Sequence, residues 1–279
     1  MFKTVGLVAR YDKKAALKLV EELAEHLAKK GVKVYLEATL AGKVSVQNEL
    51  IPLAKMQTDF IITIGGDGTI LRTCLAVPKP EPPILAVNMG DRGFLTEVEP
   101  KDACEAVDRI LKGEYKIEKC AKLSVSEGKE QFPDALNDVV ISAGEPSSIL
   151  KAQISKDGKN ILNFQADGLI VSTPTGSTGY SLSAGGPVLD PAAEAFVITP
   201  ICSLTVFHSL VFPAFSTVNF TVLSPKEVLV LIDGKYRKIV SCKEPNLEVT
   251  VSKNVTSFIR LKGDFYDRLR SRLLFKGTE

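Results

Sequence analysis

The sequence lacks the features of two large classes of protein. No stretch reaches the roughly 18 consecutive apolar residues that a membrane-spanning helix needs, and no charged leader precedes an apolar core at the start of the chain. The 35 basic and 33 acidic side chains leave a net charge of only +2. A chain so nearly balanced has no electrostatic footprint of a nucleic-acid binder. We therefore expect neither a membrane nor a nucleic acid as a partner.

Side chains that bind transition metals are also scarce. The only histidines are His26 and His208, and the five cysteines are an odd number with no CxxC spacing. A structural zinc site is therefore not expected. We interpret the cysteines as reduced thiols of a cytoplasmic protein.

The common nucleotide-binding signatures are missing as well. The chain has no G-x-x-x-x-G-K-[ST], no G-x-G-x-x-G after its first strand, and no protein-kinase signature set. These absences exclude a P-loop enzyme and a protein kinase, and they disfavour a dehydrogenase of the ordinary Rossmann type.

The chain is long enough to form two domains. It has 279 residues, of which 45% are hydrophobic and 24% charged, as in folded globular proteins. Over residues 1–114, apolar runs at 4–9, 32–36, 60–64 and 84–88 alternate with helical patterns at 13–30 and 102–112. This order predicts an α/β domain, Rossmann-like, with an open parallel sheet and helices on its faces.

From residue 115 the pattern changes to short alternating runs. Turn pairs such as Asp157-Gly158 and Asp233-Gly234 separate them. The expected strands are residues 122–126, 135–142, 149–155, 169–172, 217–223, 228–232, 238–241, 247–251 and 256–261. This predicts a β-sandwich domain over residues 115–262.

The last segment, residues 263–279, is expected to form a helix. Phe265, Leu269, Leu273 and Leu274 lie on one helical face. Because an isolated helix of this length is marginally stable, we predict that it packs back on the first domain.

The sharpest local feature is Gly65-Gly66-Asp67-Gly68-Thr69, directly after the apolar run 60–64. Glycines let backbone N–H groups approach a phosphate, and a helix beginning at Thr69 favours negative charge at its N-terminus. We expect Gly65, Gly66 and Thr69 to form a loop for the donor phosphates. The carboxylate of Asp67 can bind a metal ion or accept a proton from an attacking hydroxyl. The alternative is a structural strand-to-helix turn.

A second feature is the segment from Asp167 to Pro187, in which a strand leads into a loop rich in hydroxyls and glycine. Such a loop offers many small hydrogen-bonding groups and a close backbone, which suits a ligand with hydroxyls and phosphates. The alternative is a Ser/Thr-rich surface loop.

Four blocks in order resemble the NAD kinase family. They are GGDGT at residues 65–69, Asn88-x-Gly90-x-x-Gly93-Phe94-Leu95, Asn137-Asp138, and TPTGST at 173–178 followed by SAGGP at 183–187. The resemblance covers about residues 60 to 202. GGDG alone is less specific, since diacylglycerol-kinase-like and phosphofructokinase-like proteins carry similar elements.

The resemblance implies transfer of a phosphoryl group from ATP or polyphosphate to the 2′-hydroxyl of the adenosine ribose of NAD, giving NADP. Asp67 would be the catalytic base, and a divalent metal, Mg²⁺, the cofactor. The residues that match substrate contacts of the family are Gly68, Arg72, Asn137, Asp138, Asp167, Thr178, Gly179, Tyr180, Ser181, Leu182 and Ser183. Asp233-Gly234 is either a further contact or a plain hairpin turn.

Two alternatives remain at this point: a kinase for another hydroxyl, such as a lipid or sugar, and a non-catalytic NAD-sensing module. The chain also departs from the family pattern, because Ser203-Leu204 and His208-Ser209 stand where relatives have Pro-His and Ser-x-Arg-Pro. These departures bear on substrate preference and on the phosphate contacts.

The resemblance also bears on assembly. Residues 198–215 form a long apolar segment with one ionisable side chain, His208. Members of the resembled family are oligomers whose sites can be completed by a neighbouring subunit. We predict a homodimer or homotetramer formed through the β-domain; the alternative is that this segment lies inside the monomer core.

Overall fold

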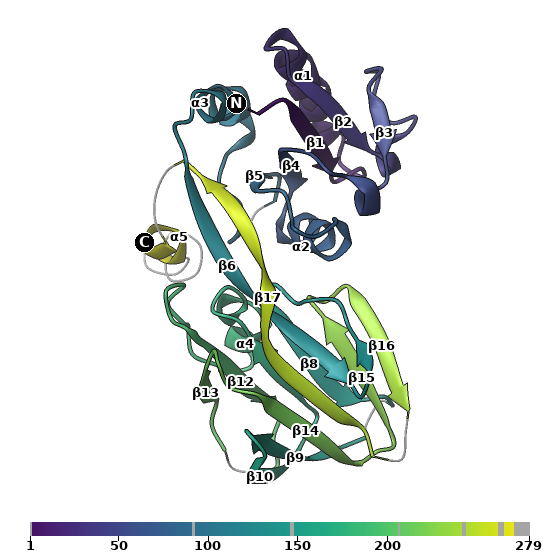
Figure 1. Cartoon of the computed structure of the whole chain (residues 1–279), viewed down its shortest axis with the longest axis vertical. Coiled ribbons are helices and arrows are strands. Elements are labelled where there is room, and N and C mark those ends of the chain that lie inside the picture. Colours follow the sequence, from purple (N-terminus) through teal and green to yellow (C-terminus); the bar gives the residue numbers. More distant parts are fainter. Residues whose placement is uncertain are drawn as a thin grey trace. The chain divides into compact units, whose positions relative to one another are not determined.

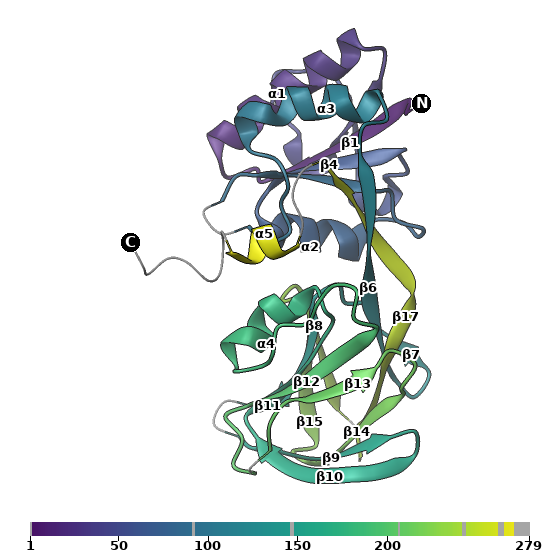
Figure 2. The ribbon, with the colours of Figure 1, turned by 90° about the vertical axis from the view of Figure 1, so that its left-hand side faces the viewer.

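The computed structural model describes residues 2–90, 93–145, 148–205, 207–241, 244–261 and 265–270. The chain divides into two compact units, Met1–Lys119 with Thr256–Glu279, and Cys120–Val255. We call the first the α/β unit and the second the β unit (Figures 1 and 2). The chain leaves the α/β unit within strand β6 (Lys116–Glu127) and returns to it within β17 (Asn246–Arg260).

The α/β unit contains a parallel sheet in the order β5-β4-β1-β2-β3, with the end of β17 beside β5. Its strands are β1 (Thr4–Ala9), β2 (Lys33–Glu37), β3 (Glu49–Ile51), β4 (Phe60–Gly65) and β5 (Ile84–Asn88). Each neighbouring pair is parallel, and Phe258 of β17 pairs with Ile84 of β5. The open parallel sheet predicted from the sequence is confirmed.

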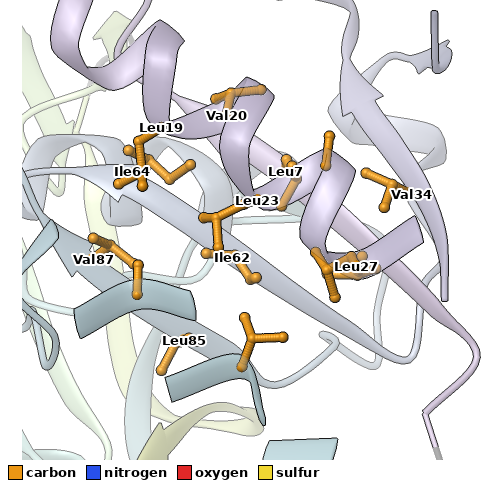
Figure 3. Close-up of a cluster of buried hydrophobic side chains, with 14 of the residues drawn as sticks. Leu7, Leu19, Val20, Leu23, Leu27, Val34, Ile62, Ile64, Leu85 and Val87 are labelled. Carbon is orange, nitrogen blue, oxygen red and sulfur yellow. The ribbon is translucent and has the colours of Figure 1, made fainter. Parts of the chain in front are cut away.

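Helix α1 (Lys14–Lys29) covers this sheet through one apolar face. Leu19, Leu23 and Leu27 lie at helical spacing and pack into the same core cluster as strand residues such as Leu7 and Ile62 (Figure 3). Helix α3 (Ala103–Leu111) adds further apolar side chains to this cluster. Burial of one such leucine contributes about 1.5–3 kcal/mol, so this cluster is a main source of the unit's stability.

The helix that follows the glycine loop begins earlier than expected. Helix α2 spans Asp67–Ala76, whereas the sequence predicted a start at Thr69. The reason is that Gly66 has an extended backbone (φ −102°, ψ −171°) and caps the helix, with its carbonyl accepting the N–H of Thr69 at 2.9 Å. Asp67 therefore lies in the first helical turn rather than in a loop.

The β unit consists of antiparallel strands, as predicted. One sheet has the order β13-β12-β11-β8-β15-β16, and β10, β9, β14 and the first part of β17 pair in that order. The strands are β8 (Asp138–Ala143), β9 (Leu150–Lys156), β10 (Lys159–Ala166), β11 (Gly168–Ser172), β12 (Ala195–Ile201), β13 (Leu210–Pro213), β14 (Val218–Ser224), β15 (Glu227–Ile232) and β16 (Tyr236–Ser241). A short strand β7 (Glu130–Gln131) pairs with β6.

Several strands differ from the sequence prediction. Strands β3, β7, β10, β12 and β13 were not predicted, and the two strands predicted at 247–251 and 256–261 are one strand, β17, which ends at Arg260. Strand β12 contains Pro200, which is a strand-breaking signal in a sequence. Strand β10 lies at a sheet edge, so it buries few of its side chains and shows a weak apolar pattern.

The C-terminal helix packs on the α/β unit, as predicted. Helix α5 (Phe265–Leu269) places the ring of Phe265 edge-on to the ring of Phe94, with centroids 5.7 Å apart. Arg268 donates to Glu118 at 3.2 Å. Leu273 and Leu274, which were expected on the same face, lie outside the described residues. Within the described chain, no helix is long and apolar enough to cross a membrane.

Candidate active site

In the α/β unit, the site is built around Asp67. Strand β4 ends at Gly65, and a side chain there would overlap the side chain of Thr69, so the tight entry into α2 requires glycine. The carboxylate of Asp67 accepts the backbone N–H of Phe94 at Oδ2 (2.9 Å) and of Leu95 at Oδ1 (3.0 Å). Two backbone donors thus fix the orientation of a carboxylate that remains partly exposed.

Phe94 and Leu95 belong to the second sequence block, which folds beside the glycine loop. Asn88 Oδ1 accepts the N–H of Gly90 at 3.1 Å, and the N–H of Met89 donates to the carbonyl of Gly65 at 2.9 Å. The structure therefore brings the first two motifs into one site. Gly66 is partly exposed and Gly68 is exposed, and a side chain at Gly66 would meet no atom of the described residues within 4 Å. None of the described residues therefore fills the space beside this glycine of the expected phosphate loop.

Arg72, a further expected ligand contact, lies on α2 and is ion-paired. Its guanidinium donates through both terminal nitrogens to the carboxylate of Glu37, with Nη2 2.8 Å from Oε2. The Glu37 side chain is 3% exposed, so the pair is anchored in the unit rather than loose on its surface. Arg72 therefore already has an anionic partner within the α/β unit.

In the β unit, the site centres on Asn137 and Asp138 at the start of β8. Asp138 is buried, and its burial together with the nearby charge of Asp233 raises its pKa to about 7. The side-chain oxygen of Asn137 is buried and has no hydrogen-bond partner among the described residues. Buried amide oxygens are nearly always paired, so this atom is available to accept a hydrogen bond from a water or a ligand.

The hydroxyl-rich loop packs directly on this segment. Thr173 donates its N–H to the carbonyl of Asn137 at 2.9 Å and its hydroxyl to the carbonyl of Leu136 at 2.6 Å. Any side chain at Gly176 would overlap the backbone of Asn137, and a side chain at Gly179 would come within 3.9 Å of Asn137 Nδ2. Asn137 and the Thr178–Gly179 part of the loop are therefore neighbours.

The remaining predicted contacts of this loop have different surroundings. Tyr180, at the start of the short helix α4 (Tyr180–Ser183), is 46% exposed, and Ser183 is exposed as well. Leu182 is partly buried. The hydroxyl of Ser181 is buried and hydrogen-bonded to the hydroxyl of Thr199 at 2.9 Å, so it already has a partner inside the β unit.

Asp167 does not lie near Asn137 in the structure. It precedes β11, whose register pairs Gly168 with Ser142 and Ser172 with Asp138. Asp167 and Asn137 therefore lie at opposite ends of a strand pair, about six residues or roughly 20 Å apart along the strand direction. Asp167 is exposed, with its N–H bonded to the carbonyl of Ile201 at 3.0 Å.

Some residues of the site could not be found from the sequence. Glu37, Asp233 and the N–H groups of Phe94 and Leu95 are brought to the site by the fold. Asp233 was named from its turn pair with Gly234 as a further contact or a hairpin turn, and the hairpin explains that pair nearly as well.

An open parallel sheet with a carboxylate held at a glycine-bounded helix start, followed by a β unit with a hydroxyl-rich loop, defines a class of phosphotransferase without a P-loop. Comparison with known families agrees. The model of the ATP-NAD kinase N-terminal domain matches residues 5–115, and that of the ATP-NAD kinase C-terminal domain matches residues 136–261. The chain belongs to the NAD kinase family, as its sequence motifs indicated.

Curated relatives span the whole chain. The chain is 38% identical to the NAD kinase of Methanothermobacter thermautotrophicus over 278 residues, covering 99% of this chain and 98% of that protein. It is 40% identical to the NAD kinase of Pyrococcus furiosus over 274 residues, covering 96% and 98% of the two chains. The chain is therefore a kinase of the kind that phosphorylates NAD.

Two solved structures are similar to this one. An NAD kinase from Archaeoglobus fulgidus in complex with ATP matches with a TM-score of 0.81 and 25% identity, covering 96% of this chain and 99% of that chain. Yeast NADH kinase complexed with NADH has a TM-score of 0.92 and 23% identity, covering 100% and 89%. The second likeness concerns the fold alone.

Proposed function

We propose that this chain transfers the terminal phosphoryl group of ATP to the 2′-hydroxyl of the adenosine ribose of NAD, with Asp67 as the general base. The observation that carries this proposal is the geometry of Asp67, whose two oxygens are both oriented by backbone N–H groups while the side chain stays partly exposed. A base held in this way loses little freedom when the hydroxyl arrives, and it sits where ligands of open α/β sheets bind.

The donor phosphates are assigned to Gly65, Gly66 and Thr69. Supporting this, no described residue lies within 4 Å of the position that a side chain at Gly66 would take, and α2 begins one residue later. ATP is favoured over polyphosphate because the similar Archaeoglobus fulgidus enzyme was solved with ATP.

Magnesium is the proposed cofactor, and its ligands would come mainly from the donor. Within the described residues, no group of three or more His, Cys, Asp or Glu side chains could hold a metal ion. This fits the usual magnesium site of a phosphotransferase, in which one or two carboxylates and the substrate phosphates bind the ion. The donor phosphates would be the main ligands of the ion, which would neutralise charge on them, and Asp67 keeps the role of base.

NAD binding is assigned mainly to the β unit. The unpaired oxygen of Asn137 would accept a donor of the dinucleotide, and Asp138 would accept hydroxyl groups. Further proposed contacts are Gly68, Arg72, Asp167, Thr178, Gly179, Tyr180, Ser181, Leu182 and Ser183.

A homodimer or homotetramer through the β unit is also proposed. Strand β13 lies at the edge of its sheet, and the exposed fractions of Leu204, Val211 and Phe215 are 66%, 51% and 85%. Asp167 lies at the far end of β11 from Asn137, so association would allow it to complete the site of a neighbouring subunit. The free thiols of Cys104 and Cys202 support a reducing, cytoplasmic location.

The direct test is an incubation of the purified chain with NAD, ATP and MgCl₂, followed by an NADP-specific enzymatic assay. We expect NADP and ADP in equal amounts, and loss of product when the metal is chelated. Binding of NAD without formation of NADP would indicate a sensor. Consumption of ATP only with a lipid or sugar acceptor would indicate a different kinase.

A further inference from the structure

Asp233 is a buried carboxylate to which the proposed function gives no role. It lies in the turn between β15 and β16, has a positive φ of 50°, and is 4% exposed. Both features are unfavourable for an aspartate, because the left-handed conformation is strained and a buried carboxylate loses its hydration. Specific interactions must compensate for them.

The compensating interactions are bonds to the backbone of the proposed NAD-binding segment. Oδ2 accepts the N–H of Leu136 at 2.8 Å, and Oδ1 accepts the N–H of Asn137 at 2.7 Å and of Asp138 at 3.1 Å. The N–H of Asp233 donates in return to the carbonyl of Asp138 at 3.0 Å. Three consecutive backbone donors therefore converge on one carboxylate.

The carbonyl groups of the same segment are held from another element. Thr173 bonds to the carbonyls of Leu136 and Asn137, as described above. With Asp233 on the N–H groups and Thr173 on the carbonyls, the backbone at Asn137 has little freedom to move. The direction of the Asn137 side chain follows from that backbone.

A second aspartate shows that the turn itself does not need such a bonding pattern. Asp157 stands before Gly158 in the turn between β9 and β10, with a φ of 49°. Its carboxylate accepts one backbone N–H, from Thr217 at 3.1 Å, and its side chain is half exposed. The two turns are alike, but only Asp233 is buried and binds a segment of the site.

We infer that Asp233 is a positioning residue for the acceptor substrate, which holds the backbone of Leu136, Asn137 and Asp138 so that the last two meet NAD. The inference rests on the proposed function, because it uses the assignment of Asn137 and Asp138 to NAD. Asp233 itself contacts backbone atoms and needs no contact with the substrate.

The charge of Asp233 affects a measurable quantity, the pH at which Asp138 ionises. Lys122, on β6, and Asp138, on β8, are charged groups that act on this position. Burial raises the pKa of Asp233 as well as that of Asp138. Removing the charge at Asp233 removes a repulsion, so the pH at which Asp138 ionises should fall. This shift reports the charge at Asp233, and a loss confined to NAD, with the KM for ATP unchanged, separates positioning of the acceptor from a general effect on stability.

The test compares Asp233→Asn with Asp157→Asn in the full chain. An asparagine keeps one acceptor oxygen but turns an NH₂ group toward a backbone N–H, so the segment should shift. For D233N we expect NAD to bind at least about tenfold more weakly by calorimetry, with a matching rise in KM for NAD. The KM for ATP should stay within about twofold, and the pH midpoint of NAD affinity should move to lower pH. D157N should match the wild type in all of these measurements.

Wild-type affinity for NAD in folded D233N would overturn the inference, as would an equal rise in both KM values. If D233N does not fold, Asp233→Glu keeps the charge but displaces the oxygens by one methylene, and the same NAD-specific loss is expected. Unchanged NAD affinity in D233E would then overturn it. A wild-type protein that forms no NADP would instead contradict the proposed function, and the calorimetric titration would still report on Asp233.

Discussion

Backbone N–H groups orient two carboxylates that have different proposed tasks. Asp67 is bonded to Phe94 and Leu95 and is partly exposed, so a substrate hydroxyl can reach it. Asp233 is bonded to Leu136, Asn137 and Asp138 and is buried, so it can act only through them. The same kind of interaction suits a base in one case and a positioning residue in the other.

Asp138 makes stability depend on pH. Its pKa is raised from 3.8 to about 7 by burial and by the charge of Asp233. A carboxyl with a raised folded-state pKa contributes stability that is full below the unfolded pKa of about 4 and is lost as the pH rises through 7. Asparagine stays neutral at every pH. We therefore expect Asp138→Asn to exceed the wild type in unfolding free energy by about 1–3 kcal/mol at pH 8, with a smaller difference at pH 5. Urea unfolding at the two pH values checks this, and a pH-independent difference would contradict it.

Asn137 should matter for NAD and little for the donor. Its side-chain oxygen lacks a partner among the described residues, so Asn137→Ala should remove a bond to the ligand and raise the KM for NAD about tenfold. Asn163→Ala, whose oxygen accepts from Gln153 elsewhere in the β unit, is a matched control that should have no effect. If the KM for ATP rises and that for NAD does not, the placement of the dinucleotide is wrong.

Among the elements, the contact between β8 and the loop before α4 tolerates no added atom. A side chain at Gly176 would overlap the backbone of Asn137, which cannot move aside as a flexible side chain would. We expect Gly176→Ala to cost about 1–3 kcal/mol in stability and to weaken NAD binding. Gly66→Ala is the control for stability, because a side chain there meets no described residue within 4 Å. The melting temperatures of both variants test this expectation. If they are equal, β8 and the loop can move apart without loss of stability.

The elements also show what a sequence can predict. Strands β1, β4 and β5 were predicted within one residue because buried parallel strands are continuous apolar runs. Strand β17 was predicted as two strands because Ser252, Lys253 and Asn254 interrupt its pattern. Asp67 and Asn137 were recognisable within motifs. Their bonds to Leu95 and Asp233 were not, since these join residues 28 and 96 positions apart.

For the whole molecule, the proposed roles are divided between the units. The base and the phosphate loop belong to the α/β unit, and most proposed NAD contacts belong to the β unit. Asp167 lies apart from Asn137 within the β unit, so its proposed contact with NAD depends on the proposed association of subunits.

For the whole molecule we therefore predict a homodimer or a homotetramer. Light scattering on a gel-filtration column at micromolar concentration should give two or four times the 30.2 kDa of one chain. Val211→Lys on the edge strand β13 should weaken association, whereas Leu50→Lys on β3 of the α/β unit should not. A mass near 30.2 kDa in fully active enzyme would contradict the prediction.

The most direct test of the central claim is the rate of NADP formation by Asp67→Asn. Loss of a general base typically lowers a rate by about 10²- to 10⁴-fold, or roughly 3–5 kcal/mol, and we expect turnover to fall in this range. NAD affinity should stay within about tenfold, because most proposed contacts lie in the β unit. Asp102→Asn, in the short turn before α3, should retain full activity. Wild-type turnover in folded Asp67→Asn would contradict the assignment of Asp67 as the base.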